Sequence, residues 1–422
     1  MKYRWINAGF LLTAFAGALA GADEFPTPAD LPSTIEAKKI LAQDPHVMAA
    51  QAQQGIATTE SQQLRSSHYQ WSVRLAGQQR RYESGASSTG GRSDEWNAEL
   101  QRPFRLPGKA SVDRRIGEAG LAEAEAGIGE ATHEAARSLA SLWLDWIGAN
   151  ARLQLMQQQE KLAQADLDAL TTRLKAGDAA RMDKGIAVAA KATARRAVIE
   201  AETDVAETRA RLETHFPGIA LQAPPALAAP VLLEGDLAQW QERIQQHSDS
   251  IRMARARVEK AKQEAKRASS DKLPDPTLAV FTASEAFGNE RIIGLSISMP
   301  LPGRYRSLAA QKAAQSVALE EQALENENRE LMAAINASHA VAQGRYHAWQ
   351  AAEEAAVEIR SSADTMAQAY ALGETGLQSL LLARRQRVDA EVALLDARLN
   401  ALRANYLLLI DGHYLWDLAH EE

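Results

Sequence analysis

Residues 103–110 read PFRLPGKA, and residues 298–305 read SMPLPGRY. After each stretch the chain continues without proline, from Gly108 to Phe216 in the first case and from Gly303 to the C-terminus in the second. Ala, Leu, Glu, Gln and Arg predominate in both runs, which is the composition of long helices. The sequence therefore predicts two long helical segments that begin at nearly the same motif.

These two segments belong to an internal repeat. The motif Leu106-Pro107-Gly108 recurs as Leu301-Pro302-Gly303, 195 positions later. A second landmark, Gly177, recurs as Gly373 at nearly the same offset. Self-similarity at a fixed spacing indicates a duplicated structural unit. Each half is predicted to run in the order helix, strand, strand, long helix, tight turn, helix.

Both long runs carry apolar side chains at seven-residue intervals. The first has Leu139, Trp146 and Leu153, then, after a break at Glu160, Leu167 and Leu174, and the second has Ala342, Trp349, Ala356, Ala363 and Tyr370. This spacing favours helices packed along a coiled-coil seam. Tight helix-to-helix turns are predicted at Gly177 and Gly373. A helix from Gly108 to Leu174 would be about 100 Å long at 1.5 Å per residue, so the predicted hairpin extends beyond any compact domain.

Between the helical segments, apolar and polar residues alternate, which is the pattern of strands with one apolar face. The apolar members are Tyr69, Trp71, Val73 and Leu75; Trp96, Ala98, Leu100 and Phe104; Leu278 and Val280; and Ile293, Leu295, Ile297 and Met299. Strands are therefore predicted over about 69–82, 94–104, 276–284 and 291–300.

The first residues have the pattern of a secretory signal peptide. Lys2 and Arg4 precede an apolar stretch from Ala8 to Leu19, and small residues follow. We expect a signal peptide over 1–22, with cleavage after Ala20 or Ala22. An uncleaved anchor is the alternative, but this apolar stretch is short for a membrane span. The mature chain is thus expected to be exported.

The rest of the chain is expected to divide into two repeats. The first covers 23–216 and ends in a helical hairpin over 108–216. A proline-rich linker over 217–234 follows. The second repeat covers 235–422, with its hairpin over 303–410. Each repeat opens with a predicted helix, from Ser33 to His68 and from Gly235 to Ser269, and Ser33 with Glu36 has the spacing of a capping box.

Composition excludes several classes of protein. The chain has 422 residues, no cysteine and a formal net charge of −7. Disulfides and lipid attachment through a thiol are therefore excluded, and nucleic acid is disfavoured as a partner. The mean hydropathy of −0.32 argues against a helical membrane bundle.

Four short amphipathic strands are too few to close a barrel. In an exported protein, strands with one apolar face suit a transmembrane barrel, whose strands face lipid and lumen alternately. Because exposed backbone is not tolerated in lipid, such a barrel has to be closed. Several copies are therefore expected to contribute strands to one barrel, with their helices forming a tube outside the membrane.

With this organisation, the sequence resembles the TolC-like outer-membrane efflux protein family over nearly the whole mature chain. The two Leu-Pro-Gly junctions carry the resemblance, together with the turn motifs RLKAGDAARMD (173–183) and YALGETGLQSLLLARR (370–385). The resemblance implies a mainly α fold with membrane β, in which a trimeric β-barrel continues into a long periplasmic α-helical barrel. It also implies a homotrimer in the outer membrane of a Gram-negative bacterium.

The same resemblance implies partners and cargo. The channel is expected to dock through a periplasmic adaptor, or membrane fusion protein, to an inner-membrane pump of the resistance-nodulation-division type. The PFRLPGK junction and the chain length are most similar to the heavy-metal branch of the family, which exports cations. Alternatives are the same channel serving drug efflux or type I protein secretion, or a periplasmic adaptor or coiled-coil scaffold.

Several residues at the predicted turns and junctions are candidates for function. In the family, acidic side chains at the hairpin tips can surround the pore, and Asp183, six positions after Gly177, matches that pattern. Ser379 stands at the corresponding place after Gly373, while Asp178 and Glu374 directly follow the two glycines. Carboxylates near a pore axis attract cations, although a carboxylate at a helix start is also explained by the helix dipole. Pro107, Gly108, Pro302 and Gly303 mark the junctions between strand and helix.

Aromatic residues beside the first strand pair are expected to form a membrane girdle, namely Trp71, Trp96 and Phe104. Packing in a soluble core is the alternative. The nine histidines are scattered, and His339 and His347 lie eight residues apart in the sequence. No metal site, no cofactor and no catalytic residue is therefore expected, and no catalytic motif is present.

Overall fold

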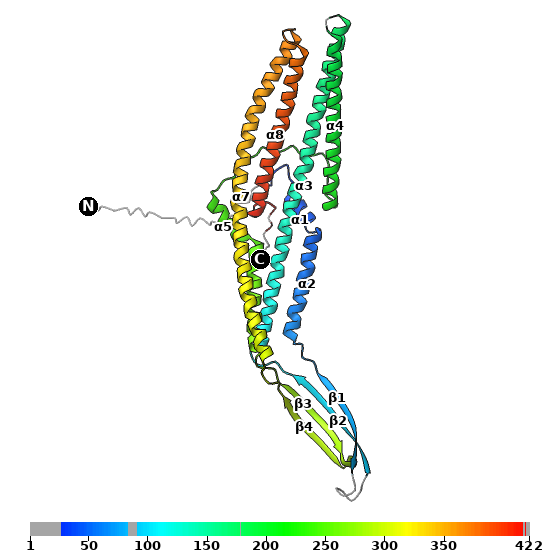
Figure 1. The fold of residues 1–422 in the computed structure, drawn as a ribbon, viewed down its shortest axis with the longest axis vertical. Helices are drawn as coiled ribbons and strands as arrows, with labels where there is room; N and C mark the ends of the chain where they lie inside the picture. Colours follow the sequence, from blue (N-terminus) through cyan, green and yellow to red (C-terminus); the bar gives the residue numbers. More distant parts are fainter. Residues whose placement is uncertain (1–26, 83–90, 178, 417, 419–422) are drawn as a thin grey trace, which may run out of the picture.

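The chain is elongated, with a sheet at one end and two helical hairpin tips at the other, as the computed structural model shows (Figure 1). The structure describes residues 27–82, 91–177, 179–416 and 418. The expected signal peptide, 1–22, and Asp178 lie outside the described residues. A long helical body connects the sheet to the tips.

The described chain forms eight α-helices, four strands and a short 3-10 turn. The helices are α1 (Thr34–Leu41), α2 (Pro45–Ser66), α3 (Lys109–Lys175), α4 (Arg181–His215), α5 (Leu237–His247), α6 (Asp249–Ser270), α7 (Arg304–Ala371) and α8 (Leu377–Asp411). The strands are β1 (Ser72–Tyr82), β2 (Gly91–Pro103), β3 (Thr277–Glu285) and β4 (Glu290–Ser298), and the turn η1 (Ala286–Gly288) joins the last two. Both halves thus have the same order of elements.

Each half opens with two helices, so the prediction of a single helix over Ser33 to His68 is wrong. Asp44 breaks this segment, because its carboxylate accepts a hydrogen bond from the His46 N–H at 2.8 Å and caps α2. Pro45 then occupies the first position of α2, where its missing N–H is not needed. The predicted capping box of Ser33 and Glu36 is present at the start of α1.

The second half is broken in the same way, so the prediction of one helix over Gly235 to Ser269 is also wrong. Ser248 ends α5 and caps α6, and its hydroxyl accepts a hydrogen bond from the Ile251 N–H. A serine in this role competes with continuation of the preceding helix. The residues that open each half therefore form a bent pair of helices.

The long helices α3 and α7 have 67 and 68 residues and run along most of the molecule (Figure 1). Helix α3 packs against α2, α4, α6 and α8, and α7 packs against α6 and α8. The predicted seven-residue series face these neighbours, since every member is buried or half-buried. None of the helices in the described part of the chain combines the length and the apolar character that a membrane-spanning helix needs.

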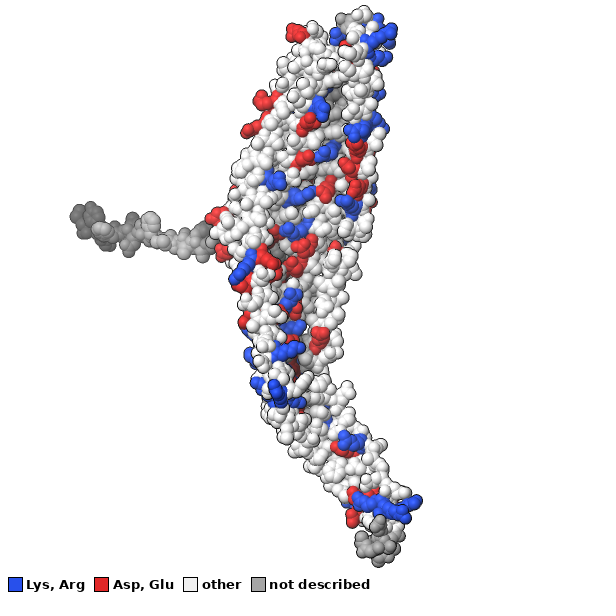
Figure 2. Space-filling model, in the orientation of Figure 1, with Lys and Arg blue, Asp and Glu red and all other residues white. Residues whose placement is uncertain are grey.

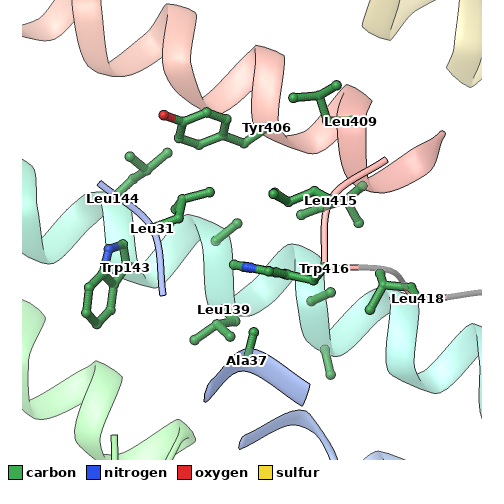
Figure 3. Packing of buried hydrophobic residues seen from close by; sticks show 14 of the residues in the cluster. Leu31, Ala37, Leu139, Trp143, Leu144, Tyr406, Leu409, Leu415, Trp416 and Leu418 are labelled. Atoms are coloured by element: carbon green, nitrogen blue, oxygen red, sulfur yellow. The ribbon is translucent and has the colours of Figure 1, made fainter. Parts of the chain in front are cut away.

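The largest apolar core lies midway along the molecule, at a level that we call the waist, where α1, α3, α5 and α8 meet. Leu139 and Leu144 of α3 pack there with Tyr406 of α8 and with Trp416 beyond it (Figure 3). The buried Asp30 carboxylate accepts hydrogen bonds from the Tyr406 hydroxyl at 2.6 Å and from the Ala228 N–H at 2.9 Å. The segment before α1, the linker and α8 are therefore held together at one point.

Candidate functional site

The four strands form one antiparallel sheet in the order β1-β2-β3-β4. In its register, Val73 lies opposite Leu100, Leu100 opposite Val280, and Val280 opposite Leu295. The next row on the same face contains Leu75, Ala98, Thr282 and Ile293. Directly opposite residues share a face of a sheet, so the alternation read from the sequence is confirmed and all four strands turn their apolar residues to the same side.

This apolar face is open to solvent in the single chain. Leu295 is 82% exposed, Ile293 83% and Leu75 75%. A contiguous exposed patch of such residues indicates contact with another protein or with a membrane. Figure 2 shows the corresponding end of the molecule as largely uncharged, with charged residues gathered towards its far tip.

On β1 and β2, the opposite face of the sheet is polar. Arg80 of β1 lies 3.2 Å from Glu95 of β2, and Arg74 lies 3.6 Å from Glu99. The Gln78 amide donates a hydrogen bond to Glu95 at 2.8 Å. A sheet with one apolar and one polar face is the pattern of a membrane barrel strand set, which faces lipid on one side and an aqueous lumen on the other.

Among the described residues, both edges of the sheet are unpaired, because β1 and β4 each have a neighbour on one side only. β1 has 11 residues and β4 has nine, lengths that suit a tilted strand crossing a bilayer. Long exposed edges with apolar side chains are rare in soluble proteins, since they invite pairing with other chains.

The aromatic residues predicted to form a girdle lie on or next to the sheet. Trp96 is within β2, Trp71 directly precedes β1 and Phe104 directly follows β2. Their exposed fractions are 52%, 60% and 42%, so none of them is packed in a core of this chain. The Arg102 guanidinium lies over the Trp71 ring, 5.4 Å from its centroid.

The two strand-to-helix junctions have similar sequences and different backbone conformations. Gly108 has a φ of +90°, which favours glycine, and it caps α3. Gly303 has a φ of −141°, which any residue adopts. Pro107 and Pro302 precede them and are both exposed. Only the first of these glycines is therefore required by the backbone.

A buried polar network surrounds the first junction. The Lys109 ammonium lies 2.9 Å from carboxylate oxygens of both Asp271 and Asp275 and donates to the Leu273 carbonyl at 2.8 Å. The Tyr69 hydroxyl donates to Asp275 at 2.5 Å. All three donors of the ammonium are thus used, although Lys109 is only 2% exposed.

The network continues into the helices. Asp113 of α3 accepts from Arg105 at 2.7 Å and from Arg267 of α6 at 2.5 Å. Arg267 also pairs with Asp271. Local sequence patterns point to the junction glycines but not to these ions, because Asp113 and Arg267 are more than 150 positions apart.

The two hairpin tips lie at the same end of the molecule, away from the sheet (Figure 1). Gly177 and Gly373 follow the C-caps of α3 and α7 with φ values of +81° and +76°. Glycine is favoured at such positions because a side chain strains the left-handed backbone. The two tips also share a small apolar cluster, which includes Leu170, Ala187, Leu377 and Leu380.

The candidate tip residues occupy equivalent places in the two hairpins. Asp183 is the third residue of α4 and Ser379 the third residue of α8, and both are half-buried. Glu374 is exposed, and its backbone N–H donates to the Ala369 carbonyl at 2.9 Å. Basic side chains surround the first tip, namely Arg173, Lys175, Arg181 and Lys184.

A row of ion pairs joins α3 to α8 along the helical body. From the waist to the tips, the pairs are Arg137–Asp411, Asp145–Arg403, Arg152–Asp396 and Asp166–Arg384. The positive partner alternates between the two helices, and Figure 2 shows the mixed charges along this part of the molecule. The alternation favours a single alignment of the two hairpins, because a shift brings like charges together.

No protein-family model and no curated protein sequence matches the chain. Its fold is similar to that of CusC, whose structures are described in terms of the conformational changes that accompany folding and transmembrane channel formation. The TM-score is 0.73, with 15% identity over 90% of this chain and 91% of the other. The outer membrane protein VceC from Vibrio cholerae has a TM-score of 0.70 and 18% identity over 90% and 95%. The Campylobacter jejuni CmeC outer membrane channel has a TM-score of 0.71 and 13% identity over 100% and 96%.

At these identities the similarity establishes the fold. The chain has the fold of TolC-type outer-membrane channels, and the fold class expected from the sequence is confirmed. The similar proteins are described as channels or outer membrane proteins.

Proposed function

We propose that this chain is one subunit of a passive channel through the outer membrane of a Gram-negative bacterium. In the proposed homotrimer, each copy adds its four strands to one closed barrel and its long helices to a periplasmic tube. The sheet carries this proposal, because it is apolar on one face and unpaired at both edges. Closing the barrel with further copies satisfies the backbone of β1 and β4, as a bilayer requires.

The internal repeat supports a specific pairing between copies. Gln101 and Ser296 are equivalent, because they are 195 positions apart, as are the two Leu-Pro-Gly motifs. Ser72 lies opposite Gln101 and Ala279 lies opposite Ser296, so Ser72 and Ala279 are equivalent too. Within the chain, β2 meets β3 with Leu100 opposite Val280. Applying the same geometry to β4 and to β1 of the partner subunit places Leu295 opposite Val73 of the partner subunit.

This register keeps the two faces of the barrel continuous. Leu295 and Val73 both belong to the apolar face, as do Ile293 and Leu75, which become the next pair. A register shifted by one residue would turn one strand's apolar residues towards the lumen. The pairing derived from the repeat is therefore the one that the lipid environment favours.

Cross-linking tests this pairing. The chain has no cysteine, so Leu295→Cys and Val73→Cys can be combined and treated in outer membranes with a short thiol cross-linker. We expect covalent dimers and trimers on a denaturing gel, because opposite Cβ atoms are about 5 Å apart in a sheet.

The matched control combines Leu295→Cys with Arg74→Cys, which places the second thiol on the other face of β1. It is expected to give little cross-linking. Equal cross-linking of both pairs would refute this register, and absence of any cross-linking or recovery of the mature chain as a monomer in the soluble periplasm would refute the trimeric barrel.

We further propose that the channel serves an efflux system with a periplasmic adaptor and an inner-membrane pump of the resistance-nodulation-division type, and that heavy-metal cations are its cargo. The PFRLPGK junction supports the metal branch, with drug efflux and type I protein secretion as alternative cargoes. A deletion strain should lose tolerance to zinc, cobalt, cadmium, copper or silver. Unchanged tolerance to all five metals would exclude the metal cargo.

The pore constriction is proposed at the tips, where Asp183, Glu374 and Ser379 lie near Gly177 and Gly373. Asp178, outside the described residues, belongs to the same proposal. Among the described residues, the basic side chains of the first tip balance its negative charge. The loss of one carboxylate would make this tip more positive. Asp183→Asn is therefore expected to change cation selectivity in a planar bilayer, and an unchanged selectivity would remove Asp183 from the constriction.

The alternative of a periplasmic adaptor or coiled-coil scaffold accounts poorly for the sheet. A scaffold in water gains nothing from exposing Leu295, Ile293 and Leu75, and such a surface promotes aggregation.

A further inference from the structure

Three histidines that are far apart in sequence meet beside the waist core. His133 lies in α3, His247 is the last residue of α5 and His413 follows α8. The His413 ring is stacked on His133 with 5.9 Å between centroids, and it lies 5.7 Å from the His247 ring. Scattered in the sequence, these residues form one cluster in the fold.

Carboxylates complete the cluster. Glu130 and Glu134 lie beside His133 on α3, and one ligand atom from each of the three residues lies within 4.8 Å of the other two. Asp411 places a carboxylate oxygen 3.2 Å from His133 Nε2. These side chains line a cavity of about 220 Å³ between α3, α7 and the end of α8.

Two imidazole nitrogens of the cluster, His247 Nε2 and His413 Nδ1, are available to bind a ligand. His247 Nδ1 lies 2.9 Å from the Arg243 carbonyl oxygen. Because a carbonyl only accepts, Nδ1 carries the hydrogen and Nε2 keeps a lone pair, the arrangement common in metal-binding histidines. His413 Nδ1 is buried and has no hydrogen-bond partner among the described residues.

Two arginines beside the cavity are paired with carboxylates. Arg137 is paired with Asp411, and Arg252 with Asp249, so these two guanidinium groups are already neutralised. The cavity is lined by four carboxylates, those of Glu130, Glu134, Asp249 and Asp411, which repel one another. A divalent cation in the cavity would relieve this repulsion between carboxylates.

We propose that Glu130, His133 and His413 form a binding site for a divalent transition-metal ion of the zinc class, with His247 as a further donor. Imidazole and carboxylate are the ligands that Zn²⁺ and similar ions prefer, whereas Mg²⁺ prefers oxygen alone. Ligand atoms around tetrahedral Zn²⁺ are about 3.3 Å apart, so the side chains have to rotate inwards on binding. The site lies within each chain and goes beyond the proposed channel function.

Equilibrium dialysis of the full-length protein in detergent, after chelator treatment, tests the site with Zn²⁺ alone. We expect one Zn²⁺ per chain, bound at least tenfold more weakly by His133→Gln and by His413→Asn. Asparagine suits position 413, because His413 has a φ of +56° and asparagine tolerates the left-handed region. His347→Gln is the matched control, since His347 is exposed on α7 outside the cluster, and its binding should not change.

Thermal unfolding gives a second readout. Zn²⁺ should raise the midpoint of the native chain and of His347→Gln, but not of the two cluster variants. If either cluster variant fails to fold, Glu130→Gln replaces it. Equal Zn²⁺ binding by native and cluster variants, or displacement of Zn²⁺ by equimolar Mg²⁺, would overturn the proposal. A failed cross-linking test of the trimer would leave this result unaffected.

Discussion

Asp166 of α3 and Arg384 of α8 are joined by two contacts near the hairpin tips. Arg384 Nε lies 2.7 Å from one carboxylate oxygen of Asp166, and Arg384 Nη2 lies 2.9 Å from the other. Burial raises the pKa of Asp166 even though Arg384 opposes that shift. The carboxylate therefore depends on its arginine to remain charged inside the structure.

Arg384→Gln should loosen the two hairpins at the tips. The change leaves the half-buried Asp166 carboxylate without its cation, which we expect to reduce the free energy of unfolding by about 3 kcal/mol. If the tips form the constriction, single-channel conductance in a planar bilayer should also rise. The double variant Asp166→Asn with Arg384→Gln should recover most of the lost stability, because no unpaired charge remains.

Arg385→Ala is the matched control for that experiment. Arg385 is 83% exposed and pairs at 4.0 Å with Asp389, itself 73% exposed. Such surface pairs contribute little, so stability and conductance should stay near native values. Equal effects of the two arginine substitutions would contradict a specific role for the pair between the hairpins.

Gly108→Ala and Gly303→Ala are expected to differ although both change the same motif. Gly108 has a φ of +90° and Gly303 a φ of −141°, and neither would have a steric clash at Cβ. Alanine at 108 should lower the free energy of unfolding by about 1–2 kcal/mol through backbone strain, whereas alanine at 303 should be neutral or slightly stabilising. Thermal midpoints of the two purified variants check this, and equal midpoints would refute the difference.

Gly117→Ala should separate α3 from α2. A Cβ at 117 would lie 2.8 Å from the Ser61 Cα atom, and backbone moves less readily than a side chain. We expect a loss of about 2 kcal/mol, in the range for overpacking. Gly344→Ala on α7 is the control, because nothing lies within 4 Å of its added Cβ, and it should stabilise the helix by up to about 1 kcal/mol. Denaturant unfolding of both variants measures the contrast.

Asp275 at the first junction should make stability depend on pH. Burial pushes its pKa upward, but hydrogen bonds from Tyr69, Lys109 and the Leu106 N–H outweigh that effect and lower the pKa below its usual value. A carboxyl with a lowered folded pKa contributes stability that is present above its unfolded pKa of about 4 and is lost as pH falls through the folded value. We therefore expect this contribution to disappear as pH falls below about 4.

Asp275→Asn isolates that contribution. At pH 7 the variant should be about 2–3 kcal/mol less stable, because Lys109 loses one of its carboxylates in a buried site. The difference between the thermal unfolding midpoints of the native protein and the variant should become smaller as pH is lowered towards 3. Asp389→Asn, at an exposed site, should show no such difference. A constant difference for Asp275→Asn at all pH values would rule out titration of Asp275 as its cause.

Local sequence patterns predicted much of this fold. The alternation at Val73, Leu100, Val280 and Leu295 was sufficient to assign the apolar face, because side chains of a strand point alternately to its two sides. The two turn glycines were recognisable because left-handed backbone favours glycine. The duplicated Leu-Pro-Gly motif placed the start of each long helix.

Contacts between distant segments were not predictable in the same way. His133 and His413 are 280 positions apart in the chain, and only the packing of α3 beside the end of α8 brings them together. The helix break at Asp44 was missed for another reason. An Asp-Pro pair is a start signal for a helix, but the helical composition continues through it.

The open sheet edges also determine the order in which this protein can mature. The helical body has its own core and contains two hairpins of consecutive helices, α3 with α4 and α7 with α8, and such local pairs can form early in a single chain. In the proposed trimer, the strands gain their last hydrogen bonds only from another copy. Chains that assemble in this way pass through a stage with exposed strand edges, whose lifetime falls as their concentration rises, and rapid encounter between copies protects them from aggregation.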